Sequence, residues 1–397
     1  MNIGFVSTWF ERGAAYVTKS YIKLLEENHN IYIYARGGEA YGKNDPNWDL
    51  PNVTWGPVLM GTQINFRHFK KWIKSNNLDT VFFNEQHEVD IVLKIKKEFP
   101  RLKLGSYIDY YKENTVKEFD LYDFLICNTK RHYFVFKDHQ QSYYVPWGTD
   151  TELYRPNYEK RADKQLTFFH SAGMSNRKGT NFVIDCFIEG EIYKEAKLII
   201  HTQKNFERNF GYNIKELEKF NVEIIEKSVT APGLYYLADV YVYPTMLDGL
   251  GLTMYEALSA GLPVITTNHP PMNEVINNDV GYLVDVDYLR SRSDAYYWPL
   301  SIIKKDSLIR GMNYFVENAE NLDNIKETAR REALNKWKWL DRKEEINDIF
   351  NNTRIIVQNP SEKLLSDRGF IRKFQLLIGS SYIYSCFKLM KRRFLNK

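Results

Sequence analysis

The chain has 397 residues, too many for one ordinary hydrophobic core, so its length predicts two domains with room for an appendage. Its hydrophobic share of 44% and charged share of 26% are normal for a globular protein. The net charge is +4, but residues 361–397 hold nine basic side chains against two acidic ones, which leaves the remainder slightly acidic. A nearly neutral body with a basic tail argues against a nucleic-acid-binding protein, whose basic patch normally lies on the folded domain.

Three cysteines, Cys127, Cys186 and Cys386, lie far apart. This odd number excludes a disulfide framework or a cysteine metal cluster and suggests a reducing compartment. The first 16 residues lack a basic start, a long apolar region and a small-residue cleavage site, so we expect no signal peptide. No stretch approaches 18 uninterrupted apolar residues, so we expect no bilayer-spanning segment.

In the first half of the chain, short β-branched and aromatic runs alternate with amphipathic segments. The strand-like runs are residues 2–8, 30–36, 79–84, 103–108 and 124–128, with helical patterns at 16–27 and 88–99 among the segments between them. This alternation predicts a parallel sheet with helices on both faces.

After a proline- and glycine-containing segment at residues 147–163, the same pattern restarts. The second set of strand-like runs is 166–172, 196–202, 222–228, 240–245, 263–267 and 281–285. We therefore predict an α/β protein with two doubly wound Rossmann-like domains, residues 1–155 and 156–345, followed by C-terminal helices and a basic tail at 346–397. Open parallel sheets bind ligands beyond the carboxyl ends of their strands, so we expect the site in a cleft between the domains.

The stretch DGLGLTMYE, residues 248–256, carries the most chemistry. Gly249 to Leu252 lie where a strand leads into a helix, and unbonded N–H groups there favour an anion. Gly249 and Gly251 lack the Cβ atoms that would hold a phosphate away. Glu256 could reach ribose hydroxyls, and Asp248 those of the group that the phosphate carries. The alternative is an ordinary loop with a capping Asp248 and a solvated Glu256, and these residues alone leave both interpretations open.

Residues 234–276 closely resemble the signature of retaining family-4 glycosyltransferases, two-domain enzymes of the GT-B fold that use nucleotide-sugar donors. The shared pattern is an acidic residue, seven residues and a Glu, with GxGL between them and EAxAxGxPVI following; Glu274 also matches. The family usually has Glu where this chain has the shorter Asp248. The resemblance implies that Glu256 binds the donor ribose, Asp248 the transferred sugar, and the amides around Gly251 and Leu252 the diphosphate.

A second element, Gly173 followed by Lys178 and Gly179, resembles the family's GR…KG motif, whose cations neutralise the leaving diphosphate. This chain has Met174 where the family usually has Arg, and its loop is about one residue shorter. We expect Arg177, beside Lys178, to supply the missing charge. The alternative is a basic helix start on a solvated face.

The first domain resembles the family's acceptor side. Gly13 follows the opening strand, where it would let the backbone approach the donor. Relatives often have a sugar-contacting His after the strand at 103–108, and this chain has Asp109 there. Glu85 and His87, which follow the preceding strand, are further candidates for the acceptor side. The alternatives are a plain turn at Gly13, a capping role for Asp109 and a surface position for His87.

We expect neither a metal nor another cofactor, because the sequence has no His/Cys cluster and because helix amides and Lys178 would hold the diphosphate. The tail at 361–397 mixes apolar and basic residues at helical spacing. It favours an interfacial helix on an anionic membrane surface, with a helix packed on the first domain as the alternative.

The resemblance thus implies a metal-independent retaining glycosyltransferase of the hexosyltransferase type. It would move a sugar from a nucleotide diphosphate, with UDP expected, to a hydroxyl of a cell-surface or lipid-linked glycan. Transfer would be a front-face displacement with the leaving group stabilised by Lys178, Arg177 and the Gly251 amides. We expect a cytoplasmic protein, peripheral on the inner membrane face, without nucleic-acid partners. The alternatives are a nucleotide-sugar epimerase or phosphorylase on the same scaffold, and a non-catalytic relative that binds a glycan or nucleotide.

Overall fold

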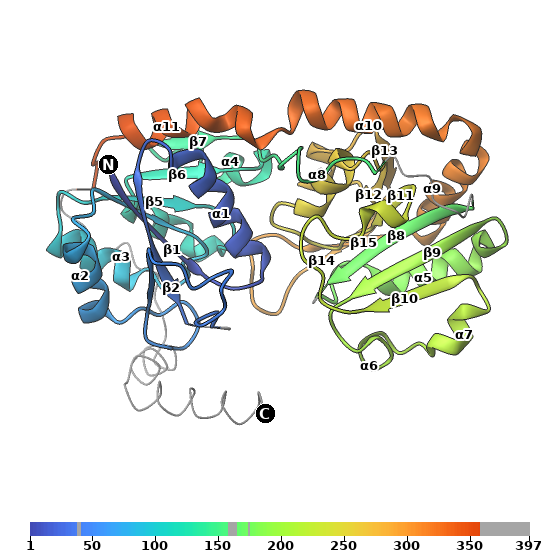
Figure 1. Cartoon of the computed structure of the whole chain (residues 1–397), viewed down its shortest axis with the longest axis horizontal. Coiled ribbons are helices and arrows are strands. Elements are labelled where there is room, and N and C mark those ends of the chain that lie inside the picture. Colours follow the sequence, from blue (N-terminus) through green and yellow to red (C-terminus); the bar gives the residue numbers. More distant parts are fainter. Residues whose placement is uncertain (38–40, 158–164, 174, 358–397) are drawn as a thin grey trace. The chain divides into compact units, whose positions relative to one another are not determined.

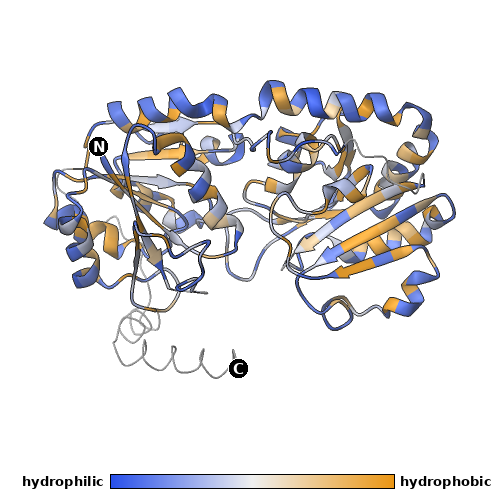
Figure 2. Cartoon of the chain, in the orientation of Figure 1, coloured by the Kyte–Doolittle hydropathy of each residue, from blue (hydrophilic) through white to orange (hydrophobic). Residues whose placement is uncertain are grey.

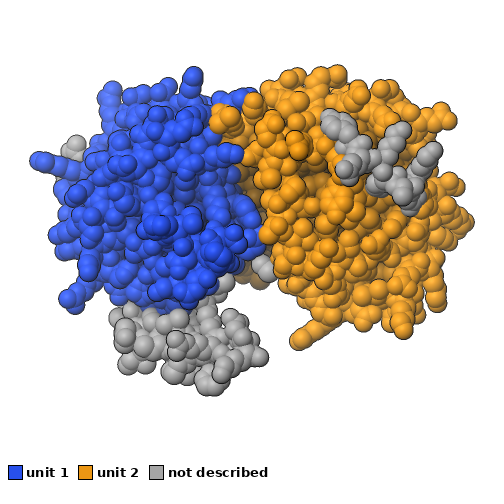
Figure 3. Space-filling model, viewed as in Figure 1, with its two compact units in different colours: residues 1–145, 341–397 blue, residues 146–340 orange. Residues whose placement is uncertain are grey.

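The computed structural model describes residues 1–37, 41–157, 165–173 and 175–357, and its elements are labelled in Figure 1. They form two compact units: Pro146–Leu340 make the second, and Met1–Val145 with the described chain from Asp341 onward make the first (Figure 3). The division falls at 145 and 340, whereas the sequence placed it at 155 and 345. Residues predicted to close the first domain pack in the second unit, where Trp147 lies on Trp339 with ring centroids 4.3 Å apart.

The first unit is built on a parallel sheet with the strand order β3-β2-β1-β4-β5-β6-β7. Its described strands are β1 Asn2–Thr8, β2 Asn30–Arg36, β3 Val53–Trp55, β4 Thr80–Phe83, β5 Lys103–Tyr107, β6 Phe124–Cys127 and β7 Ser142–Tyr144. Its described helices are α1 Gly13–Leu25, α2 Phe66–Ser75, α3 Asp90–Glu98, the 3-10 helix Glu113–Leu121, α4 Lys130–Phe136 and α11 Lys343–Asn352.

The second unit repeats this plan with the order β10-β9-β8-β11-β12-β13 and adds the antiparallel pair β14-β15. Its described strands are β8 Leu166–Gly173, β9 Ala196–Thr202, β10 Val222–Glu226, β11 Val240–Tyr243, β12 Val264–Thr267, β13 Gly281–Val284, β14 Val286–Arg290 and β15 Leu300–Ile303. Its described helices are α5 Thr180–Glu189, α6 Phe206–Phe210, α7 Ile214–Glu218, α8 Leu252–Ser259, α9 Lys305–Glu317 and α10 Leu322–Lys336, with 3-10 turns Ile192–Lys194, Tyr235–Leu237, Met272–Glu274, Ala319–Asn321 and Trp339–Arg342.

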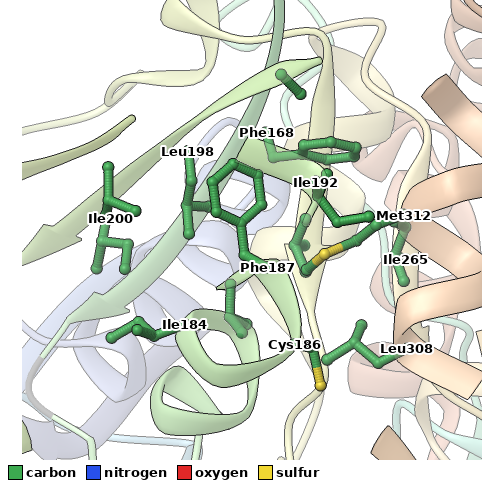
Figure 4. Close-up of a cluster of buried hydrophobic side chains, with 14 of the residues drawn as sticks. Phe168, Ile184, Cys186, Phe187, Ile192, Leu198, Ile200, Ile265, Leu308 and Met312 are labelled. Atoms are coloured by element: carbon green, nitrogen blue, oxygen red, sulfur yellow. The ribbon is translucent and has the colours of Figure 1, made fainter. Parts of the chain in front are cut away.

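Both main sheets are parallel and doubly wound, as predicted. Their central strands are buried along most of their length because helices cover both faces. Figure 2 shows the apolar residues gathered on the strands and on one side of the helices. In the second unit Phe168 and Leu198 of the sheet lie against Phe187 of α5, with Leu308 and Met312 of α9 beside them (Figure 4).

Three further features bear on the predictions. In each sheet the order reverses between two neighbouring strands, β1 and β4 in the first and β8 and β11 in the second; in open α/β sheets this is where ligands bind. No helix within the described ranges is long and apolar enough to cross a membrane. The predicted interfacial helix at 361–397 lies outside the described residues.

A buried ion pair holds the C-terminal segment onto the first unit. The side chains of Lys96 and Asp123 are both fully buried, and Asp123 also accepts the backbone N–H groups of Leu104, Ile356 and Val357, at 2.8, 3.0 and 3.2 Å. The carboxylate thus joins β5 to the chain that follows α11.

Lys96→Met should lower the free energy of unfolding by about 3–5 kcal/mol, because it leaves a buried carboxylate without its counter-charge. Urea denaturation followed by circular dichroism measures the loss. The control is Lys70→Met, whose pair with Glu98 is 35% and 37% exposed and should contribute less than about 1 kcal/mol. Equal losses in the two variants would contradict the importance of the buried pair.

Candidate active site

The second unit brings its predicted ligand-binding loops together at the point where its strand order reverses. Lys178 and Gly179 follow β8, and Asp248 to Gly251 follow β11, the strand that pairs with β8. The two loops are hydrogen-bonded to each other, since the amide of Met246 donates to the carbonyl of Arg177 at 2.8 Å. Residues 70 positions apart in sequence therefore share one site.

Two glycines in left-handed conformations shape the starts of the two helices. Gly179 precedes α5 with φ +79°, and a Cβ there would lie 2.3 Å from the carbonyl oxygen of Pro244. Gly251 precedes α8 with φ +73°. Glycine is the residue that adopts this backbone without steric cost, so both turns depend on it. Gly173, at the end of β8, also has positive φ, and no described atom lies within 4 Å of where its Cβ would be.

The central feature of the site is a charged cluster of Lys178, Tyr243 and Asp248. The ammonium of Lys178 donates to the Tyr243 hydroxyl and to Oδ2 of Asp248, and the same hydroxyl donates to Oδ2. Oδ1 of Asp248 accepts the backbone N–H of Gly251 at 3.0 Å. Both Asp248 oxygens are therefore engaged, and Lys178 and Asp248 each keep 20% of the side chain exposed.

The electrostatics of this cluster keep Asp248 ionised. Burial alone would raise the pKa of Asp248, but the charge of Lys178 and the hydrogen bonds from Lys178, Tyr243 and Gly251 outweigh it, so the pKa lies well below its usual range. Burial, and then the neighbouring Asp248, raise the pKa of Tyr243. The phenol consequently stays protonated and able to donate.

Glu256 lies in α8, and its surroundings shift its pKa in the direction opposite to that of Asp248. The hydroxyl of Tyr235 donates to Oε2 of Glu256 at 2.6 Å, and Tyr154 also hydrogen-bonds this carboxylate. Burial raises the pKa of Glu256, and these hydrogen bonds and the charge of Lys178 offset part of the rise. Glu256 is thus a half-buried hydrogen-bond acceptor rather than the solvated residue of the alternative interpretation.

The amides at the start of α8 divide between two tasks. The N–H of Gly251 donates to Asp248. Leu252 is the first residue of α8, and the backbone N–H groups in the first turn of a helix have no acceptor within that helix. Gly249 is half-buried in the same turn, and Arg177 has an exposed side chain on the neighbouring loop. Met174, the departure from the family motif, lies outside the described residues.

The first unit gathers its candidate residues at the corresponding edge of its own sheet. Gly13 opens α1 after β1, Glu85 and His87 follow β4, and Asp109 follows β5. The His87 ring lies 4.4 Å from that of Tyr110, and burial lowers the pKa of His87.

Glu85 takes part in an ion pair in that unit. Its carboxylate lies 3.5 Å from the guanidinium of Arg12, and its backbone carbonyl accepts from the buried Arg36 at 2.9 Å. Glu85 also has a positive φ of 51°, which costs energy for a residue other than glycine. These contacts give Glu85 a structural role in the loop after β4.

Sequence reasoning missed the tyrosines that bond to Asp248 and Glu256. Tyr243 and Tyr235 sit in buried apolar runs, where an aromatic side chain predicts only packing, and Tyr154 lies in the segment predicted to be a linker. The single available signal was the alternation of Val and Tyr in β11, which places Tyr241 and Tyr243 on one face of the sheet. Within the described ranges, no group of three or more His, Cys, Asp or Glu side chains could hold a metal ion.

Comparison with known proteins agrees with this geometry. Residues 151–292 match the family of glycosyl transferases group 1. The match confirms the predicted resemblance at the level of group 1, while membership of family 4 stays a prediction. O-antigen chain mannosyltransferase B of Escherichia coli is 41% identical over 54 residues, 14% of either chain. The chain covers 14% to 47% of the lengths of the curated relatives that it matches.

Solved structures confirm the predicted fold class. A glycosyltransferase of Rickettsia africae superposes with a TM-score of 0.68 at 14% identity, covering 88% of this chain and 99% of that one. Anabaena HepE in complex with UDP superposes with a TM-score of 0.67 at 13% identity and the same coverage. The two Rossmann-like units therefore have the fold of GT-B glycosyltransferases.

Gly179→Ala should lower the free energy of unfolding by about 2–5 kcal/mol, because strain at positive φ adds to a clash with the Pro244 carbonyl. The matched control is Gly211→Ala, which has φ +83° but no described atom within 4 Å of the added Cβ, and should lose only about 1–2 kcal/mol. Chemical denaturation compares the two. Similar losses would indicate that the Pro244 contact is unimportant.

Proposed function

We propose that the protein is a retaining glycosyltransferase that moves a hexose from a nucleotide diphosphate donor to a hydroxyl of a glycan or lipid-linked glycan. The observation that carries this proposal is the juxtaposition of Lys178, the start of α8 and the hydrogen-bonded Glu256 at the reversal point of the second sheet. The site lies within the segment that matches glycosyl transferases group 1.

The charges at this site suit the departure of a diphosphate. When the bond between sugar and phosphate breaks, negative charge grows on the leaving oxygen, and a fixed cation and helix N-terminus stabilise it. Lys178 supplies the cation and Leu252 begins the helix. Arg177, exposed on the adjoining loop, adds positive charge nearby. No metal ion is needed for this neutralisation.

Glu256 suits a ribose. A half-buried carboxylate that already accepts from Tyr235 has further lone pairs, and a vicinal diol supplies two donors to them. UDP is our proposed nucleotide, supported by the UDP complex of Anabaena HepE. A glycan acceptor is supported by the O-antigen chain mannosyltransferase relative.

The remaining parts of the proposal concern the acceptor side and the membrane. Gly13, Asp109 and His87 gather at one edge of the first sheet and would contact the sugar or the acceptor there. Residues 361–397, predicted from sequence to bind an anionic membrane surface, would place the protein at the inner membrane face.

Glu256→Gln should raise the KM for the donor about 10- to 100-fold, since it removes charge-assisted hydrogen bonds of about 1.5–3 kcal/mol. The test incubates the full chain with UDP-, GDP- and ADP-sugars and a lipid-linked glycan acceptor, and measures nucleotide release. The control is Glu223→Gln, whose carboxylate on β10 is 48% exposed and paired with Lys197. Failure of the unaltered protein to release nucleotide from any donor would refute the transferase assignment.

Chelation by EDTA should leave the transfer rate unchanged within about twofold, because Lys178 and the start of α8 neutralise the diphosphate in place of a metal. The measurement repeats the release assay after dialysis against EDTA, with added Mg²⁺ and Mn²⁺ as the comparison. A rate that falls on chelation and returns with metal would contradict metal independence.

A further inference from the structure

Strand β11 ends in a tyrosine that contacts the cation of the site in two ways. The Lys178 ammonium donates to the hydroxyl of Tyr243 and also lies 4.6 Å from the centroid of its ring. The Tyr243 side chain is fully buried, and its hydroxyl donates to Asp248. The ring and hydroxyl are thus fixed by the core of the sheet rather than by the mobile stem of the lysine.

A lysine needs such support if its charge is to act at one point. Its four-carbon stem is flexible, and a carboxylate alone accepts an ammonium from several directions. Asp248 and the Tyr243 hydroxyl together fix two of the three N–H donors of Lys178. With respect to the described residues one donor is left, on a side chain that is 20% exposed.

We propose that Tyr243 is a positioning residue that orients Lys178, so that its remaining N–H donor meets the diphosphate of a bound nucleotide. This role rests on the proposed function of the site. It also assigns Asp248 a share in holding the cation, in addition to any contact with the transferred sugar.

Tyr241 provides a matched control within the same strand. It lies two residues before Tyr243 on the same face of β11, with ring centroids 5.6 Å apart and planes inclined by 20°. Its hydroxyl is buried and, within the described residues, makes no hydrogen bond to Lys178 or Asp248. Removing either hydroxyl changes a buried tyrosine to phenylalanine, but only one change reaches the cation.

The experiment titrates the full chain with UDP, GDP and ADP by isothermal titration calorimetry, and in separate titrations with the nucleosides uridine, guanosine and adenosine. Tyr243→Phe should weaken binding of the nucleoside diphosphate about 3- to 10-fold, as loss of one hydrogen bond predicts, and should change the affinity for the nucleoside by less than about twofold. Tyr241→Phe should leave the affinities for the diphosphate and for the nucleoside unchanged.

A double-mutant cycle with Lys178→Met tests whether the hydroxyl acts through the lysine. Tyr243→Phe should cause no further loss of diphosphate affinity once Lys178 is absent. Full additivity, an equal loss for the nucleoside, or an unchanged affinity in Tyr243→Phe would each overturn the positioning role. If the unaltered protein binds none of the three nucleotides, the proposed function fails and the role of Tyr243 fails with it. Binding by the unaltered protein with no effect of Tyr243→Phe rejects the positioning role alone.

Discussion

The site depends on the balance of charge around one carboxylate oxygen. Oδ2 of Asp248 accepts from both Lys178 and Tyr243, so a lysine from the loop after β8 and two residues from β11 and its loop become one structural unit. An unpaired carboxylate or ammonium so little exposed would be costly, whereas the pair offsets both charges. Together with the hydrogen bond from the Met246 amide to the Arg177 carbonyl, this contact joins the two loops.

The surroundings shift the pKa values of the two acidic residues of the motif in opposite directions. Lys178 and three hydrogen bonds keep the pKa of Asp248 low, while burial among tyrosines raises the pKa of Glu256. A motif records only that both are acidic. The structure assigns Asp248 to the cation and to Gly251, and leaves Glu256 as an acceptor whose neighbours are hydroxyl groups.

The sequence predicted the sheets well because their long strands are apolar on both faces and separated by amphipathic helices; β1 and β9 occupy the predicted ranges. It missed β3 and β7, which are three residues long and only half-buried, and the hairpin β14-β15, whose first strand is mostly exposed. The candidate residues were found by motif. Their contacts were not, because the partners of Asp248 come from separate loops and a buried tyrosine in a strand resembles ordinary core.

The pairing of Lys178 with Asp248 also bears on how an anion can enter the site. A lysine neutralised by a carboxylate would ordinarily attract a phosphate weakly, since the net charge of the pair is zero. Here the hydroxyl of Tyr243 and the amide of Gly251 also donate to Asp248, so both carboxylate oxygens are bonded within the cluster. With respect to the described residues, Lys178 keeps one N–H donor beyond those that bond to Asp248 and Tyr243, on a side chain that is 20% exposed. The N-terminus of α8, in the adjoining turn, adds a helix dipole that favours an anion.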